Sequence, residues 1–232
     1  MLDKSAQAVS QMFGDIAPTY DLLNHLLCAN QDKRWRRRAV ARLCPRVGET
    51  ILDLCCGSGD LTREILSQQP RCRVVGADFA LPMLRIAQTK DLPALTCADA
   101  LRLPFRDAQF DAVSVAFGVR NFTDTRAGLQ EMFRVTKPGG RVMVLEFMRP
   151  TSNIIARGAG ASNFVLAPIG RLVSGHESAY SYLPQSIDGF TSRAEFANLL
   201  REIGWRNVRS FDHALGVATS FVGVKPTLQS GG

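Results

Sequence analysis

Between residues 50 and 147, short apolar runs alternate with segments of helical periodicity. The runs are four or five residues long and rich in valine, leucine and alanine, which is typical of buried strands. In the intervening segments, apolar residues recur every three or four positions, which predicts helices. Strand-like runs separated by helices indicate βαβ units and a parallel sheet. The predicted strands are 50–54, 73–77, 94–97, 112–116 and 142–145, and the predicted helices are 60–67, 81–89 and 125–135.

The flanking segments have other patterns. The first 45 residues predict a helical cap, with leucines recurring at helical spacing over 22–27. Residues 150–190 are rich in glycine, alanine, serine and proline and predict a lid inserted over the sheet. The chain then continues with a predicted helix over 192–203 and two neighbouring strands over 206–211 and 217–224.

We expect one domain over residues 1–232, because this length fits a single large domain with additions. The run from Lys137 to Gly140 predicts a turn before the fifth strand, since proline presets φ and glycine accepts positive φ. The expected parts are an N-terminal helical cap (1–45), a cofactor-binding core (46–149), a lid or substrate insertion (150–190) and a C-terminal helix with strands (191–225).

The composition fits an ordinary globular protein, with 46% hydrophobic and 21% charged residues. No apolar run approaches the roughly 18 residues of a membrane span, and no basic-then-apolar leader is visible. We therefore expect a cytoplasmic location. The six cysteines form no CxxC pair and only three histidines accompany them, so we expect free thiols and no metal site.

The formal net charge is +7, and a dense basic run extends from Lys33 to Arg38. On a helix, such a run is compatible with a solvated face or with a surface that meets an anion or a membrane. An anionic lipid surface would allow transient, peripheral contact at the inner face of the plasma membrane. Charge alone does not choose between these interpretations.

A glycine-containing loop follows the first predicted strand, between Asp53 and Asp60. Gly57 and Gly59 would let the backbone approach a ligand at the carboxyl end of the sheet. The third glycine of the dinucleotide fingerprint would fall at Thr62, which disfavours a nicotinamide dehydrogenase. A plain tight turn remains the alternative for this loop.

Acidic residues end the next strands. Asp78 can accept both hydroxyls of a ribose, and Asp99 can accept from an adenine amine. Asp53 and Asp60 could face a cationic group. Four carboxylates suit a nucleoside with positive charge rather than a polyanion. S-adenosylmethionine, with its sulfonium and ammonium groups, is such a ligand.

The loop, the acidic strand ends and the Lys-Pro-Gly-Gly segment resemble class I S-adenosylmethionine-dependent methyltransferases over residues 50–147. This resemblance implies an α/β, Rossmann-like, seven-stranded, mostly parallel sheet with an antiparallel last strand. It also implies S-adenosylmethionine as the cofactor. The expected cofactor-binding residues are Asp53, Gly57, Ser58, Gly59, Asp78, Phe79, Asp99, Ala100 and Ala116.

Four further segments resemble the ubiquinone/menaquinone biosynthesis C-methyltransferase family. They begin at Tyr20, Phe117, Leu145 and Tyr180 and read YDLLNHLL, FGVRN, LEFMRP and YSYLPQSI. The resemblance implies C-methylation of a prenylated hydroquinone, from demethylmenaquinol to menaquinol. A quinol of the ubiquinone or phylloquinone pathway is an alternative. The family analogy also allows a homodimer.

The fourth-strand segment supplies the expected catalytic residues. We expect Arg120 to stabilise a developing phenolate and Asn121 to orient the quinol hydroxyl. The structural alternative is that Arg120 pairs with a local acid such as Asp124 and holds the loop. The outer segments supply expected substrate contacts at Tyr20, His25 and Tyr182.

Two further functions remain compatible with the sequence. The sequence pI near 9.4 allows an RNA or protein methyltransferase, although no Asn-Pro-Pro-Tyr motif is present and we expect no nucleic-acid partner. A protein that binds S-adenosylmethionine without catalysis is the other alternative.

Overall fold

The computed structural model describes residues 30–90, 92, 94–149 and 185–227. Most of the expected helical cap and of the expected lid lie outside the described residues. The predicted roles of Tyr20, His25 and Tyr182 therefore have no structural description.

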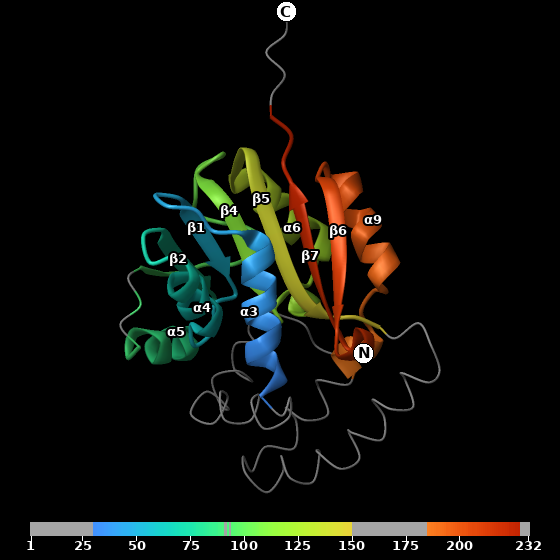
Figure 1. Cartoon of the computed structure of the whole chain (residues 1–232), viewed down its shortest axis with the longest axis horizontal. Helices are drawn as coiled ribbons and strands as arrows, with labels where there is room; N and C mark the ends of the chain where they lie inside the picture. The colour runs from blue at the N-terminus through green and yellow to red at the C-terminus, as the bar shows by residue number, and fades with distance from the viewer. Residues whose placement is uncertain (1–29, 91, 93, 150–184, 228–232) are drawn as a thin grey trace, which may run out of the picture.

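Seven strands form one sheet in the order β3-β2-β1-β4-β5-β7-β6 (Figure 1). The first five pair in parallel, whereas β7 is antiparallel to both β5 and β6. The predicted seven-stranded sheet with an antiparallel last strand is confirmed. The strands are β1 (Thr50–Leu54), β2 (Arg73–Asp78), β3 (Leu95–Cys97), β4 (Phe110–Ala116), β5 (Thr136–Phe147), β6 (Arg206–His213) and β7 (Ala218–Val224).

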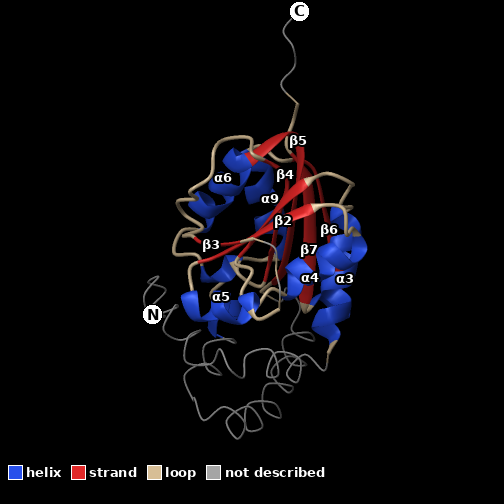
Figure 2. Cartoon of the chain, turned by 90° about the vertical axis from the view of Figure 1, so that its left-hand side faces the viewer, coloured by secondary structure: helices blue, strands red, loops and turns tan. Residues whose placement is uncertain are grey.

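Helices cover both faces of the sheet (Figure 2). One face packs against α3 and α4, and the other against α6 and α9, so two apolar layers enclose the strands. No helix in the described part of the chain combines the length and the apolar character that a bilayer crossing needs. The helices are α3 (Gln31–Leu43), α4 (Asp60–Gln68), α5 (Leu81–Gln88), α6 (Thr125–Val135) and α9 (Arg193–Ile203).

Two helix starts are fixed by capping side chains. The Asp124 carboxylate accepts from the Ala127 N–H at the start of α6. At α9, the Ser192 hydroxyl accepts from the Glu195 N–H while the Glu195 carboxylate accepts from the Ser192 N–H. Such caps satisfy N–H groups that have no partner within the helix, which sets where each helix begins.

The predicted turn at 137–140 is wrong as a separate turn, because these residues belong to β5. The pairing of β4 with β5 is irregular here. Phe110 pairs with Thr136 and Ala112 pairs with Arg141, so β5 has extra residues between these two pairs. Gly139 has φ 77°, and its N–H donates to the Lys225 carbonyl. Pairing with the residues after β7 thus extends the strand through its Pro-Gly-Gly sequence.

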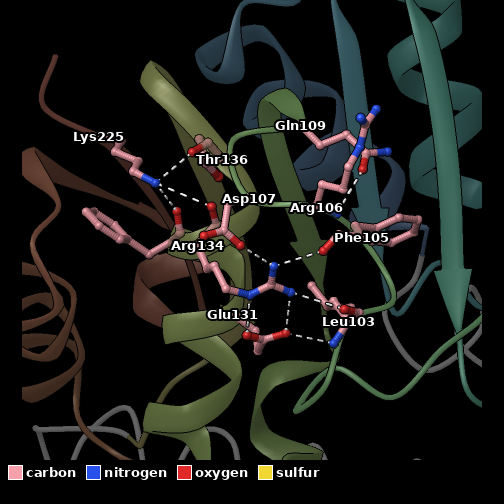
Figure 3. Close-up of polar contacts among 10 residues, drawn as sticks. Leu103, Phe105, Arg106, Asp107, Gln109, Glu131, Arg134, Thr136 and Lys225 are labelled. Carbon is pink, nitrogen blue, oxygen red and sulfur yellow. Dashed lines mark hydrogen bonds and ion pairs between the residues drawn. The ribbon is translucent and has the colours of Figure 1, made fainter. Parts of the chain in front are cut away.

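Arg134 anchors the β3–β4 connection to the end of α6 (Figure 3). Its guanidinium donates twice to Glu131 and once to Asp107, at 2.7–2.8 Å, and also reaches the Leu103 and Phe105 carbonyls. Nearby, the Lys225 ammonium donates to the Phe133 and Thr136 carbonyls, where a cation complements the helix C-terminus. The Arg134 side chain alone therefore donates to two loop carbonyls and two carboxylates.

Arg134→Ala is expected to lower the free energy of unfolding by about 2 kcal/mol, because loop carbonyls and carboxylates lose their donor together. Urea denaturation followed by circular dichroism measures this change. Arg106→Ala, at an exposed neighbouring position, is the control and should stay within about 0.5 kcal/mol of the unmodified protein. Equal stability of the two variants would contradict the anchoring role.

Candidate cofactor and active site

The loop after β1 turns sharply at left-handed residues. Cys55, Gly57 and Gly59 have φ values of 53°, 54° and 89°. The Cys56 N–H donates to Ala77 and the Gly59 N–H to Cys56, so the loop folds back against the end of β2. A Cβ on Gly59 would meet the end of the Leu92 side chain, which can move aside. The positive φ of Gly59 is therefore the reason that glycine is favoured at this position.

Asp78, at the end of β2, holds the loop in this shape. Its two carboxylate oxygens accept from the Gly57 N–H at 2.8 Å and the Ala80 N–H at 2.9 Å. Burial raises the pKa of Asp78, and the backbone donors partly oppose this rise. Each oxygen can accept more than one hydrogen bond, so the same carboxylate can also serve a ligand.

Asp53 lies fully buried beneath the loop. The Thr62 hydroxyl donates to its Oδ2 atom at 2.6 Å, whereas its Oδ1 atom has no hydrogen-bond partner among the described residues. Burial raises the pKa of Asp53 to about 7, against the opposing effect of the Thr62 hydrogen bond. A buried carboxylate with an unpartnered oxygen is suited to a cationic ligand.

Affinity for S-adenosylmethionine is expected to rise as the pH rises towards 7 and to level off above it. Below about pH 7 the folded protein keeps Asp53 protonated, and a cationic ligand must displace that proton. The same raised pKa affects stability. As the pH rises from the value at which an exposed Asp ionises to about 7, the contribution of Asp53 to the free energy of unfolding falls. Titration calorimetry from pH 5.5 to 8 tests the affinity, with Asp53→Asn expected to remove this dependence. A pH-independent affinity in the unmodified protein would contradict it.

The other predicted cofactor residues lie around the same end of the sheet. Asp99 is exposed after β3, where its Oδ1 atom accepts from the Leu101 N–H. The Phe79 carbonyl faces the Cys97 thiol at 3.7 Å. Ser58 and Ala100 are buried, and Ala116 is partly buried at the end of β4. The glycine loop with the carboxylates around it, together with the unpartnered Asp53 oxygen, fits a cationic nucleoside such as S-adenosylmethionine.

Asp60 is already engaged by cations of the protein. Its carboxylate lies 3.3 Å from the Lys90 ammonium and 3.7 Å from the Arg36 guanidinium. Arg36 in turn pairs with the buried Asp32 of α3. Asp60 therefore joins the start of α4 to α3 and to the residues just after α5.

The segment after β4 packs directly on the glycine loop. Phe117 has φ 59°, and a Cβ on Gly118 would lie 2.5 Å from the Cys55 Cβ atom. A short 3-10 helix, η1 (Val119–Asn121), follows and contains both predicted catalytic residues. The close approach at Gly118 thus brings the segment with Arg120 and Asn121 beside the glycine loop.

Arg120 is buried and paired with Glu146 rather than Asp124. Its Nη1 atom donates to Glu146 at 2.8 Å and to the Phe117 carbonyl at 2.6 Å, and its Nε atom donates to Ser186 at 3.3 Å. Glu146, fully buried at the end of β5, also accepts from the Arg120 and Phe147 N–H groups. The alternative that named Asp124 is wrong about the acid.

Aromatic rings line the sheet beside this ion pair. The ring centroids of Phe117 and Phe147 lie 4.7 Å apart, and the Trp35 ring of α3 lies beside both. His213 lies 6.4 Å from Trp35 and bonds Ser220, while burial and nearby arginines lower its pKa to about 4. No sequence motif points to this histidine, which is neutral at pH 7.

Comparison with known proteins identifies the family. The model of the ubiE/COQ5 methyltransferase family matches residues 1–225. Demethylmenaquinone methyltransferase from Thermus thermophilus is 44% identical, over 93% of this chain and all of that protein. The protein of the same name from Deinococcus radiodurans is 43% identical, over 94% and 93% of the two chains. The solved structure of the [4+2]-cyclase SpnF shares the fold, with a TM-score of 0.72, 15% identity and 96% of each chain covered. The chain therefore belongs to the ubiE/COQ5 methyltransferase family.

Proposed function

We propose that the protein methylates a ring carbon of a prenylated hydroquinone, with S-adenosylmethionine as methyl donor, and converts demethylmenaquinol to menaquinol. The observation that carries this proposal is the close contact between the glycine loop, at Cys55, and the segment that contains Arg120, at Gly118. Family membership and the names of the two curated relatives support the acceptor class. Quinols of the ubiquinone and phylloquinone pathways are the alternative acceptors.

S-adenosylmethionine supplies a methyl group already activated on a sulfonium, so the protein must mainly bind, align and exclude water. Alignment alone can contribute about 7–11 kcal/mol. In this proposal, Asp78 and Asp99 hold the nucleoside and Asp53 faces the positive charge. The remaining proposed contacts to the cofactor come from the glycine loop and the strand ends: Gly57, Ser58, Gly59, Phe79, Ala100 and Ala116.

Arg120 and Asn121 are the proposed catalytic residues. A quinol carbon becomes a strong nucleophile as the neighbouring hydroxyl loses its proton, and a nearby guanidinium favours that phenolate. Glu146 fixes the orientation of Arg120 and offsets part of its charge. Tyr20, His25 and Tyr182 are the proposed contacts to the quinol.

The prenyl tail of such an acceptor dissolves in the bilayer. We therefore propose that the protein works from the cytoplasmic side, in transient peripheral contact with the membrane surface. A homodimer is proposed from family analogy, and no nucleic-acid partner is expected.

Methyl transfer from labelled S-adenosylmethionine to a short-chain demethylmenaquinol, kept reduced, tests the proposed function. Total tRNA serves as a parallel acceptor. Label in the quinol is the expected result. Label in the RNA, or in neither despite cofactor binding, would overturn it.

Arg120→Lys is expected to lower kcat at least about tenfold while S-adenosylmethionine affinity stays unchanged, because lysine keeps the charge but loses the planar donor geometry. Steady-state kinetics with the short-chain quinol and calorimetry with the cofactor measure the two effects. Arg126→Lys, in an exposed ion pair on α6, is the control. Normal turnover of a folded Arg120→Lys enzyme would contradict the proposed role.

A further inference from the structure

The helix α3 has two sharply different faces. Trp35, Ala39, Val40 and Leu43 are buried against the sheet. The outward residues of the first two turns are all cationic and exposed: Lys33, Arg34, Arg37 and Arg38.

These four cations have no acidic partner within the part of the chain that the structure describes. The one acid in the first turn of the helix, Asp32, is buried and pairs with Arg36. Some exposed arginines elsewhere have an acidic partner, for example Arg126 with Glu202 and Arg193 with Asp212. Others, such as Arg85 on α5 and Arg106 in the β3–β4 connection, have none among the described residues but lie on separate elements. The feature that distinguishes α3 is therefore the gathering of four such cations on one helix face.

The same positive surface continues onto the edge strand β6. The Arg42 guanidinium lies 4.1 Å from the Phe211 ring centroid, and the Arg209 guanidinium lies 5.9 Å from the same ring. Burial and the charge of Arg38 lower the pKa of Arg42, as expected where cations crowd together. We define these six side chains as the α3 basic face: Lys33, Arg34, Arg37, Arg38, Arg42 and Arg209.

We propose that the α3 basic face docks on the anionic phospholipid headgroups of a bilayer. This inference rests on the proposed function, because a prenylated acceptor resides in the bilayer. Charge complementarity supports it, since arginine binds phosphate through paired donors and the face carries no acid of its own among the described residues. The helix lies at the front of the sheet in Figure 1, with its outward side away from the strands.

The position of the face relative to the site favours lipid over a free anion. Arg36 reaches Asp60 directly after the glycine loop, and Trp35 contacts Phe117 and Phe147 beside the Arg120 segment. The first turns of α3 are therefore adjacent to the end of the sheet where the cofactor and acceptor are expected. A bilayer held there would place its dissolved quinol next to the methyl donor.

Vesicle co-sedimentation of the full chain tests the proposal. The vesicles contain phosphatidylcholine alone or phosphatidylcholine with 30% phosphatidylglycerol. The protein is expected to bind the anionic vesicles at least about 100-fold more tightly, and less tightly as salt is raised. Each cation near such a surface raises the binding affinity about fivefold. The quadruple variant with Lys33→Gln, Arg34→Gln, Arg37→Gln and Arg38→Gln should therefore bind the anionic vesicles several hundredfold more weakly.

A matched variant removes the same charge elsewhere, at four exposed arginines off α3: Arg71→Gln, Arg73→Gln, Arg85→Gln and Arg106→Gln. It should keep most of the vesicle binding, and circular dichroism should confirm that both variants fold. Equal binding by both variants, or binding to total tRNA instead of vesicles, would overturn the proposal. Methyl transfer to the short-chain quinol in solution should stay normal in the α3 variant. Vesicle binding without any methyl transfer would overturn the proposed function and leave the docking face standing.

Discussion

Glu146→Gln is expected to lower the free energy of unfolding by about 3–5 kcal/mol. Glutamine keeps the shape of the side chain but leaves the buried Arg120 guanidinium without its counter-charge. The substitution also replaces one of two oxygens that accept from the Arg120 guanidinium and from two backbone N–H groups. Urea denaturation followed by circular dichroism measures the loss, and a variant too unstable to purify folded agrees with it.

The comparison variant is Glu202→Gln. Glu202 pairs with Arg126, but both side chains are half exposed, at 57% and 50%. Water screens this pair, so its loss should cost less than about 1 kcal/mol. A double variant, Arg120→Met with Glu146→Met, should recover part of the loss, because no charge is left buried alone. Glu146→Gln within 1 kcal/mol of the unmodified protein would show that the pair does not stabilise the fold.

Asp78→Ala is expected to weaken S-adenosylmethionine binding roughly 100-fold. Hydrogen bonds to a charged group contribute about 1.5–3 kcal/mol each, and the carboxylate is proposed to accept from the ribose. The substitution also removes the acceptor that fixes the Gly57 and Ala80 N–H groups, so the loop loses its shape. Titration calorimetry with S-adenosylmethionine measures the change.

Asp78→Asn separates these two contributions. The amide keeps one oxygen acceptor but not the charge, so an intermediate loss of about tenfold is expected. Glu202→Ala, on the exposed surface of α9, is the control for a lost carboxylate and should bind normally. Affinity within threefold of the unmodified protein in Asp78→Ala would contradict a role in cofactor binding.

The order of strands and helices in the core could be predicted because each depends on local patterns. Apolar runs and turn residues placed β1, β2, β4 and the intervening helices within a few residues. The start of β5 could not be predicted in this way. Its Pro-Gly-Gly sequence favours a turn, but pairing with residues after β7, more than 80 positions later, holds it extended.

The same limit applies to the site. Gly57, Gly59 and Asp78 follow from a loop whose parts are close in sequence. The partner of Arg120 does not, because Glu146 lies 26 positions away and reaches it through the pairing of β4 with β5. In the sequence, Thr62 stands only where the dinucleotide fingerprint has a glycine, whereas in the structure its hydroxyl donates to the buried Asp53 carboxylate.

Among the described strands, β7 comes last along the chain, yet it lies between two strands that precede it, β5 and β6. A nascent chain that has produced β5 and β6 still exposes the edge of β5 along residues 141–147, where β7 will pair. An exposed, apolar strand edge of this kind is prone to pair with other chains. Folding of this half of the sheet therefore waits for residues 218–224 to leave the ribosome. Truncation before them would yield an aggregation-prone product rather than a smaller stable domain.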